Sequence, residues 1–177
     1  MKNNLLPFML LLLSLAFSCR PLPEIDEHHA TDIHIVTGLH LREHDGSSRG
    51  TLGNPNTKAG TIEAYPNPAD DVLSVHSSDT IQKVWITVGF QETGFQDTDF
   101  ESLFQSLEHQ PADLEIFTAK IFNPASSIFN LDVSDLPSGY RRIFYLMKDN
   151  TIRWDNLFID HERPFPTSVN QLIEDWN

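Results

Sequence analysis

The segment RIFYLMKDNTIRWDNLFI, residues 142–159, decides the fold, because a turn signal divides it into two apolar runs. The turn signal is Asp149-Asn150, and the runs on either side cover residues 142–147 and 152–159. Comparable runs occur earlier in the chain, at residues 72–75, 83–88, 114–117 and 128–133. Short strands at this spacing predict a mainly β protein, an antiparallel β-sandwich. Trp85 and Trp154 lie within the runs, and we expect both in the core.

One segment between these runs has helical spacing instead. Its apolar residues recur at i, i+3, i+4 and i+7, on one helical face: Phe100, Leu103, Phe104 and Leu107. Thr98 as the N-cap and Glu101 at the third helical position form a capping box. Pro111 would end the helix. We therefore expect one short inserted helix, from Asp99 to His109.

Residues 161–177 form a C-terminal extension beyond the predicted sandwich. Its apolar residues also recur with helical spacing: Phe165, Val169, Leu172, Ile173 and Trp176. They predict a C-terminal helix capped at Thr167 or Ser168. This helix would pack back on the domain, and a partner-binding peptide is the alternative.

The chain begins with the pattern of an export signal. Lys2 precedes an apolar run at residues 5–17, which is shorter than the roughly 20 residues that span a bilayer as a helix. Cys19, the only cysteine, follows Leu15-Ala16-Phe17-Ser18, which resembles a bacterial lipoprotein box. We expect residues 1–18 to be a signal peptide and Cys19 to be acylated. A cysteine lost or left free after ordinary cleavage is the alternative.

Acylation at Cys19 would make the protein an outer-membrane lipoprotein of the cell envelope, held at the membrane by its acyl chains. The pattern leaves open whether it faces the periplasm or the cell surface. Residues 19–60 are predicted to be a tether with one strand at residues 33–41, where Gly38 could form a bulge. Residues 44–60 are glycine-rich and predict a loop, and residues 61–160 form the sandwich domain.

The charge of the chain limits its partners. Twelve lysines and arginines face 25 aspartates and glutamates, which gives a formal net charge of −13. This balance argues against nucleic acid, whose binding depends on the neutralisation of phosphates. It also argues against docking on anionic lipid head groups. Solubility, associated cations or a basic partner all fit an acidic exported surface.

Two motifs, about sixty residues apart, lie near the two ends of the predicted domain. The first runs from Ala64 to Val75 and contains Tyr65-Pro66-Asn67-Pro68, and the second reads Leu131-Asp132-Val133-Ser134-Asp135-Leu136-Pro137-Ser138-Gly139-Tyr140. Together they resemble the type A C-terminal sorting domain of type IX secretion cargo from Bacteroidota. The resemblance covers residues 61–160 and implies an immunoglobulin-like β-sandwich.

The residues of the two motifs also predict local structure without the resemblance. Pro66 and Pro68 fix extended backbone without donor groups, which suits a sheet edge or an entry turn. Leu131 and Val133 should face inward and Asp132 outward. Leu136 to Gly139 should then reverse the chain, with Gly139 at positive φ.

The chain departs from the sorting domain in two places. Residues 84–120 hold a longer insertion that includes the predicted helix, and residues 161–177 continue past the domain to an acidic end. A lipid anchor is also a different means of retention at the surface. We therefore carry over the fold from the resemblance, and we keep the secretion role as an alternative function.

A histidine-rich segment is the strongest local candidate for chemistry. It contains five histidines mixed with carboxylates: His28, His29, His34, His40 and His44. Imidazole with carboxylate suits zinc, copper or nickel, and on one strand His34 and His40 would share a face. The spacing matches no recognised motif such as H-E-x-x-H. The sequence therefore leaves two alternatives for this segment: a weak metal site, or solvated polar residues beside a strand.

No catalytic pattern appears along the chain, which lacks a G-x-S-x-G segment, a phosphate-binding loop and an EF-hand loop. We therefore predict no catalytic residues and no cofactor. The predicted function is a non-enzymatic, lipid-anchored envelope protein, acting as a binding or structural module with a protein or glycan partner. Type IX secretion cargo and a metal-binding protein that uses the histidines are the alternatives.

Overall fold

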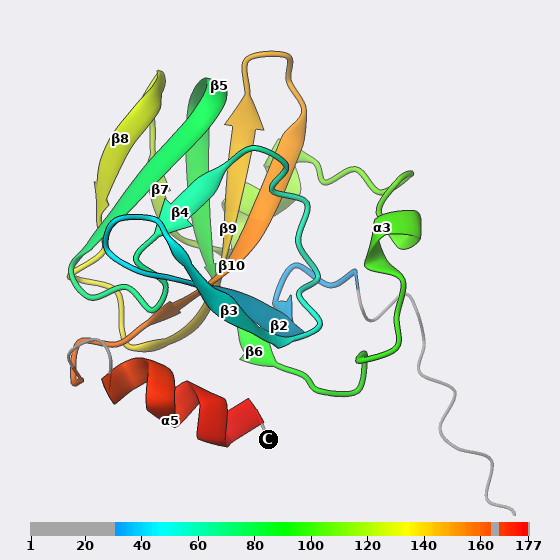
Figure 1. Cartoon of the computed structure of the whole chain (residues 1–177). Coiled ribbons are helices and arrows are strands. Elements are labelled where there is room, and N and C mark those ends of the chain that lie inside the picture. The colour runs from blue at the N-terminus through cyan, green and yellow to red at the C-terminus, as the bar shows by residue number, and fades with distance from the viewer. Residues whose placement is uncertain (1–30, 164–166, 177) are drawn as a thin grey trace, which may run out of the picture.

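The computed structural model describes residues 31–163 and 167–176, and it shows a mainly β protein with few helices (Figure 1). The predicted signal peptide, Cys19, His28 and His29 lie outside the described residues. None of the described helices is long and apolar enough to cross a membrane.

The long strand β5, Val72–Val88, organises the main sheet. Its first half lies between β4, Glu63–Tyr65, and β8, Ser126–Asp132. Its second half lies between β7, Thr118–Phe122, and β9, Gly139–Met147. All four pairings are antiparallel, and the register shifts near Ile81 on both sides of β5. Because the partners change at this irregularity, the two halves of β5 belong to differently oriented parts of one curled sheet.

The sheet nearly closes on itself. Strand β10, Ile152–Ile159, pairs with β9 in the antiparallel sense. Its far end is bridged in parallel by Ala69, whose N–H donates to the carbonyl of Phe158 at 2.8 Å. The N–H of Asp160 donates to the carbonyl of Ala69, also at 2.8 Å. The enclosed interior is apolar and includes Leu73, Val75, Val84, Ile86, Leu131, Ile143, Tyr145 and Leu157.

A second apolar cluster covers the outer face of β5, β9 and β10. Trp85, Phe144 and Trp154 each project from one of these strands and are fully buried. The segment 95–117 packs over them. It includes α3, Phe100–Leu103, and α4, Pro111–Phe117. The burial of Trp85 and Trp154 confirms the prediction that both belong to the core.

The N-terminal strands and the last helix form a third cluster. Strand β1, Ile35–Val36, pairs in parallel with β6, Phe90–Gln91. Strand β2, Gly38–Arg42, pairs with β3, Ser48–Gly53, in the antiparallel sense. Helix α5, Thr167–Trp176, lies against these strands (Figure 1) and buries Val169 and Leu172 among their apolar residues. The predicted C-terminal helix is confirmed, and it packs back on the domain.

The helix predicted from Asp99 to His109 is wrong over most of its length, because α3 ends at Leu103. Asp99, not Thr98, is its N-cap, and the Asp99 carboxylate accepts a hydrogen bond from the Ser102 N–H at 3.1 Å. The helix can end early because Lys58 satisfies two carbonyls beyond it. The Lys58 ammonium group donates to the carbonyls of Phe104 and Leu107, at 2.7 and 3.3 Å.

The strand predicted at residues 114–117 is also wrong, because these residues belong to α4. Pro111 begins this helix instead of ending the previous one. Proline is well suited to a first helical position, where its missing N–H would have no helical partner. Only Leu114 of α4 is buried, so the short apolar run that suggested a strand reflects one contact with the sheet.

The segment predicted as a tether contains more structure than expected. The loop prediction for residues 44–60 is wrong over Ser48–Gly53, which form β3. Of these residues only Leu52 is buried, so no apolar alternation marked the strand. The strand predicted at residues 33–41 is divided at Thr37. Gly38 begins β2 where the backbones meet closely, since a Cβ there would lie 2.4 Å from the Leu52 carbonyl oxygen.

Candidate functional site

The two motifs that carry the family resemblance meet at one end of the curled sheet. The N–H of Val133 donates to the carbonyl of Asp71 at 2.8 Å, and Val72 pairs with Asp132 in the register of β5 and β8. Leu131 and Val133 are buried and Asp132 is exposed, as predicted. Hydrogen bonds from Ser134 lower the pKa of Asp132.

The turn of the second motif is fixed by side chains from both ends of the domain. Gly139 has a φ of 133°, which confirms the positive value expected from the turn. The Arg141 guanidinium donates to the carbonyl of Pro137. His161 contacts the carbonyl of Leu136 through Nε2 at 2.7 Å, and its Nδ1 lies 3.3 Å from the Asp71 carboxylate. These contacts are structural, since they hold the backbone of the motif.

Asn67 of the first motif has an equally structural role. It lies between the buried Pro66 and Pro68, and the Tyr65–Pro66 and Asn67–Pro68 peptides are cis. Its backbone N–H and carbonyl bond to Arg42 of β2, each at 3.0 Å. Its side chain donates to the carbonyls of His40 and Asn156, at 2.9 and 3.0 Å, and accepts from the Phe158 N–H at 3.0 Å. The motif therefore joins β2 to β10.

Asn67 is one member of a buried set that we call the polar seam: Asn56, Asn67, Arg142, Asp155 and Asn156. The Arg142 guanidinium donates to the carbonyls of Asp32 and Asn56, at 2.8 and 3.0 Å. Asn56 donates to the Ile35 carbonyl at 2.9 Å, and Asn156 to the Gly38 carbonyl at 2.8 Å. Asp155 lies 3.3 Å from the Arg42 guanidinium. The seam thus attaches the N-terminal strands to the main sheet.

Burial sets the electrostatics of the seam. It lowers the pKa of Arg142 to about 9, and the charges of Asp32 and Asp155 oppose this shift. Arg142 therefore stays protonated at neutral pH. Its two bonds to carbonyls compensate part of the cost of burying the charge.

The described histidines of the predicted metal cluster do not converge. His34 bonds through Nδ1 to the Val88 carbonyl at 2.8 Å, whereas the Nδ1 of His40 lies 3.3 Å from the Thr51 hydroxyl. His44 lies beside a different hollow, next to Pro68. Because the predicted strand is divided at Thr37, His34 and His40 do not lie on one strand. Within residues 31–163 and 167–176, no group of three or more His, Cys, Asp or Glu is placed to hold a metal ion.

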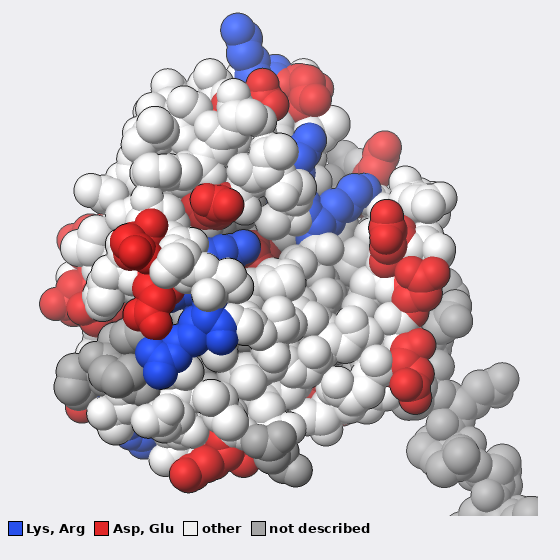
Figure 2. Space-filling model, viewed as in Figure 1, with Lys and Arg blue, Asp and Glu red and all other residues white. Residues whose placement is uncertain are grey.

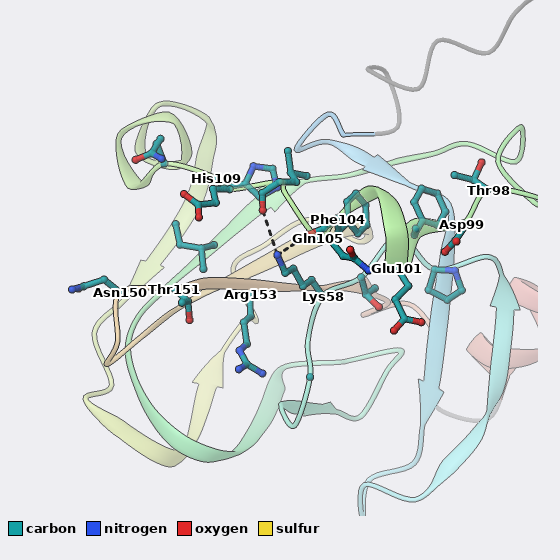
Figure 3. A pocket seen from close by; sticks show the side chains of 18 of the residues that line it. Lys58, Thr98, Asp99, Glu101, Phe104, Gln105, His109, Asn150, Thr151 and Arg153 are labelled. Atoms are coloured by element: carbon teal, nitrogen blue, oxygen red, sulfur yellow. Dashed lines mark hydrogen bonds between the residues drawn. The ribbon is translucent and has the colours of Figure 1, made fainter.

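A cavity that sequence reasoning missed is the best candidate binding site. We call it the groove; it has a volume of about 1030 Å³ and is lined by parts of segments 54–60, 98–111 and 149–153 (Figure 3). Lys58 projects between these segments, where its ammonium group bonds the carbonyls of Phe104 and Leu107. The same group lies 5.6 Å from the centroid of the Trp154 ring. Lys58 therefore ties the wall formed by residues 98–111 to the sheet.

His109 lies in this wall and is held against aromatic rings. Its ring centroid is 4.7 Å from that of Trp154 and 5.1 Å from that of Phe144, both in edge-to-face geometry. Its Nε2 is buried without a hydrogen-bond partner. Burial, followed by the charges of Arg142 and Lys58, lowers the pKa of His109 to about 4. His109 is therefore neutral at pH 7 and is a weak proton acceptor.

The rim of the groove carries charges of both signs. Its carboxylates are Asp99, Glu101, Glu108 and Asp149, and its cations are Lys58 and Arg153. Hydrogen bonds from Ser102 lower the pKa of Asp99, and hydrogen bonds from Thr151 lower the pKa of Asp149. Both carboxylates are ionised at neutral pH and act as hydrogen-bond acceptors. The groove can therefore receive a ligand that offers several donors.

Arg153 is positioned by the local backbone. A Cβ on Gly60 would lie 2.0 Å from the Arg153 guanidinium, so the glycine leaves the space that the side chain occupies. Gly60 also has a φ of 64°, which favours glycine. On the face seen in Figure 2, acidic side chains gather at the left and right margins, Lys and Arg side chains lie among those at the left and above the centre, and an uncharged area covers the lower centre.

Comparison with protein-family models, with curated proteins and with solved structures finds no match to this chain.

Proposed function

We propose that this chain is a non-catalytic, lipid-anchored protein of the bacterial cell envelope that binds its partner in the groove. The groove is the observation that carries the binding role. Its volume is at the upper end of the roughly 300–1,000 Å³ of ligand sites, and its wall is held in place by Lys58. The lipoprotein-like box at Leu15 to Cys19 supports the anchor.

The state of its titratable groups supports binding over catalysis. The histidine of the groove, His109, has a pKa of about 4 and packs edge-on to two aromatic rings, so it makes a poor general base at neutral pH. The lowered pKa values of Asp99 and Asp149 make them poor proton donors. The two carboxylates are better suited to accept hydrogen bonds from a ligand.

The rim favours a glycan of the envelope as the partner. Side-chain amides and carboxylates supply both donors and acceptors for hydroxyl groups, and the amides that line the groove include Gln105, Gln110 and Asn150. A protein partner would be recognised in the same space through its backbone. Binding of a peptide instead of a glycan would show that the partner is a protein.

Glycan and peptide arrays probed with the purified, acylated protein in detergent test the binding role. Gln105→Trp should fill part of the groove and weaken binding at least tenfold. Gln82→Trp is the matched control, because Gln82 is exposed on β5 and does not line the groove. Equal binding by both variants, or no ligand on either array, would contradict the proposal.

The anchor has its own test. The intact mass of the mature protein should correspond to a chain that begins at Cys19 and carries acyl groups, and Cys19→Ser should release the protein from the membrane fraction. Protease treatment of whole cells then distinguishes the periplasmic leaflet from the surface. Membrane retention of Cys19→Ser equal to the wild type would show that Cys19 is not the anchor.

The proposal includes an immunoglobulin-like sandwich related to type IX sorting domains. The hydrogen bond between Val133 and Asp71, and the pairing of Val72 with Asp132, support this relation, because they bring the two motifs together. They also favour type IX secretion cargo as a second candidate function. Release into the medium that depends on the secretion machinery would support that candidate over stable anchoring.

A further inference from the structure

Apolar side chains gather on the surface where the described chain begins. We call this surface the entry patch: His34, Val88, Phe90, Ile116 and Phe117. The four apolar members are unusually exposed, at 39% for Val88, 59% for Phe90, 73% for Ile116 and 50% for Phe117. We infer that the entry patch rests on the zwitterionic surface of the bilayer that holds the acyl anchor. This inference rests on the proposed lipid anchor.

His34 makes the patch continuous. Its ring centroid lies 5.4 Å from that of Phe117 and 6.1 Å from that of Phe90, in edge-to-face geometry. Its Nδ1 contacts the Val88 carbonyl at 2.8 Å. Residues from β5, β6 and α4 therefore surround one histidine of the N-terminal segment, and Ile116 precedes Phe117 on α4.

The patch lies where the anchor would hold the domain. The Ile33 carbonyl accepts a hydrogen bond from the Thr87 hydroxyl at 3.4 Å, so the chain enters the fold beside the patch. Thr31 follows Cys19 by twelve positions. Twelve extended residues span at most about 40 Å, so the patch is confined close to the membrane surface. Such a short link raises the effective concentration to the millimolar range, so a weak surface contact is sufficient.

Area and charge favour a bilayer over other occupants. A few exposed apolar side chains present a few hundred Å², well below the roughly 800 Å² per partner of a stable dimer. Phenylalanine and aliphatic side chains insert into the boundary between head groups and acyl chains. The net charge of −13 would be repelled by an anionic membrane surface, so the lipid in contact with the patch should be zwitterionic.

Quenching of tryptophan fluorescence by brominated phosphatidylcholine tests the contact in the full acylated chain, reconstituted in liposomes. Phe90→Trp places a probe in the patch. Ile128→Trp is the matched control, because Ile128 is 63% exposed but pairs opposite His76, in the other half of β5. Brominated lipid should quench the new tryptophan of Phe90→Trp at least twofold and leave that of Ile128→Trp unchanged.

A second variant tests the chemistry of the contact. Adding Phe117→Glu to Phe90→Trp should remove most of the quenching, while the acyl anchor keeps the protein in the floating liposome fraction. Equal quenching at positions 90 and 128, or none at position 90 in a protein that still floats, would overturn the inference. A dimer that forms through position 90 would overturn it as well. If the wild-type acylated protein did not float with the liposomes, the proposed lipid anchor would be contradicted instead. Failure of the anchor is therefore distinguishable from failure of the membrane contact.

Discussion

The interior of the curled sheet and the polar seam are equally buried, but different forces hold them. The interior consists of apolar side chains such as Leu73 and Leu131, which face each other across β5 and β8. Its stability depends on the apolar area removed from water and on filled volume. The seam depends on individual hydrogen bonds, because a buried polar atom without a partner is costly.

The two regions therefore restrict the sequence in different ways. The seam residues bond mainly to backbone carbonyls of the N-terminal strands, including those of Asp32, Ile35, Gly38 and His40. Any residue supplies a carbonyl, so these bonds place little demand on the side chains of those strands. The seam side chains themselves must keep both their shape and their donors. The interior should accept isosteric exchanges that the seam does not.

Replacement of Asn67 should have the largest effect. Asn67→Ala leaves the carbonyls of His40 and Asn156 and the N–H of Phe158 without their partner, and should lower the free energy of unfolding by about 3–5 kcal/mol. Asn67→Asp should be at least as damaging, because its carboxylate would face two carbonyl oxygens. Urea denaturation followed by circular dichroism measures both. Asn130→Ala, at an exposed position of β8, is the control and should change little.

Replacement of Leu73 should have the next largest effect. Leu73 is fully buried, so Leu73→Ala should cost about 2–4 kcal/mol through lost apolar contact and a cavity. Leu73→Met conserves volume and should cost less than about 1.5 kcal/mol. The same denaturation experiment compares the pair. If the methionine exchange cost as much as Asn67→Asp, the distinction between interior and seam would be lost.

His109 sharpens the comparison, because it is a polar group packed on an apolar face without a partner at Nε2. Its pKa is about 4 in the folded protein against about 6.5 when unfolded, so the unfolded chain binds the proton more readily between these values. The contribution of neutral His109 to the free energy of unfolding is fully present above pH 6.5 and is lost as the pH falls toward 4. The loss should reach about 2 kcal/mol, after allowance for partial exposure.

Denaturation at pH 7.0 and pH 4.5 measures this loss. His109→Phe keeps the aromatic contacts and removes the titration, so most of the extra acid sensitivity should disappear. His76→Phe is the matched control, since His76 is exposed on β5 and bonds to the Tyr65 hydroxyl. An unchanged pH dependence in His109→Phe would show that other groups cause the acid sensitivity.

Apolar runs predicted β8, β9, β10 and the two ends of β5, and β9 and β10 are rich in apolar residues because both of their faces are buried. The apolar pattern did not predict β4, β7 or the middle of β5. It failed for Ser48–Gly53, where Leu52 alone is buried, and for α4, where the single contact of Leu114 resembles a strand. Helix α5 was predictable because its apolar residues recur at helical spacing, and Val169 and Leu172 of that face are buried on the domain. The early end of α3 was not predictable, since it depends on Lys58, more than forty positions away.

The positions of the two sorting-domain-like motifs were predictable from the sequence, and so was part of their structural role. The inward residues and the positive φ of Gly139 follow from local rules, whereas the bonds of Asn67 reach residues up to 91 positions away. The groove could not be predicted, because its three lining segments become neighbours only after the chain folds. The turn signal at Asp149-Asn150 and the segment 98–111 were recognisable in the sequence, but nothing in the sequence placed them beside each other.

The bonds along the first described strand also determine how the domain would bear a mechanical load. Tension applied at Thr31 would reach four nearby carbonyls, those of Asp32, His34, Ile35 and Val36. Each of them accepts a hydrogen bond from a different residue: Arg142, Phe90, Asn56 and Glu92 respectively. The pull is thus shared among several parts of the fold and does not peel one strand from its neighbour. A domain held from this end should therefore unfold slowly under force.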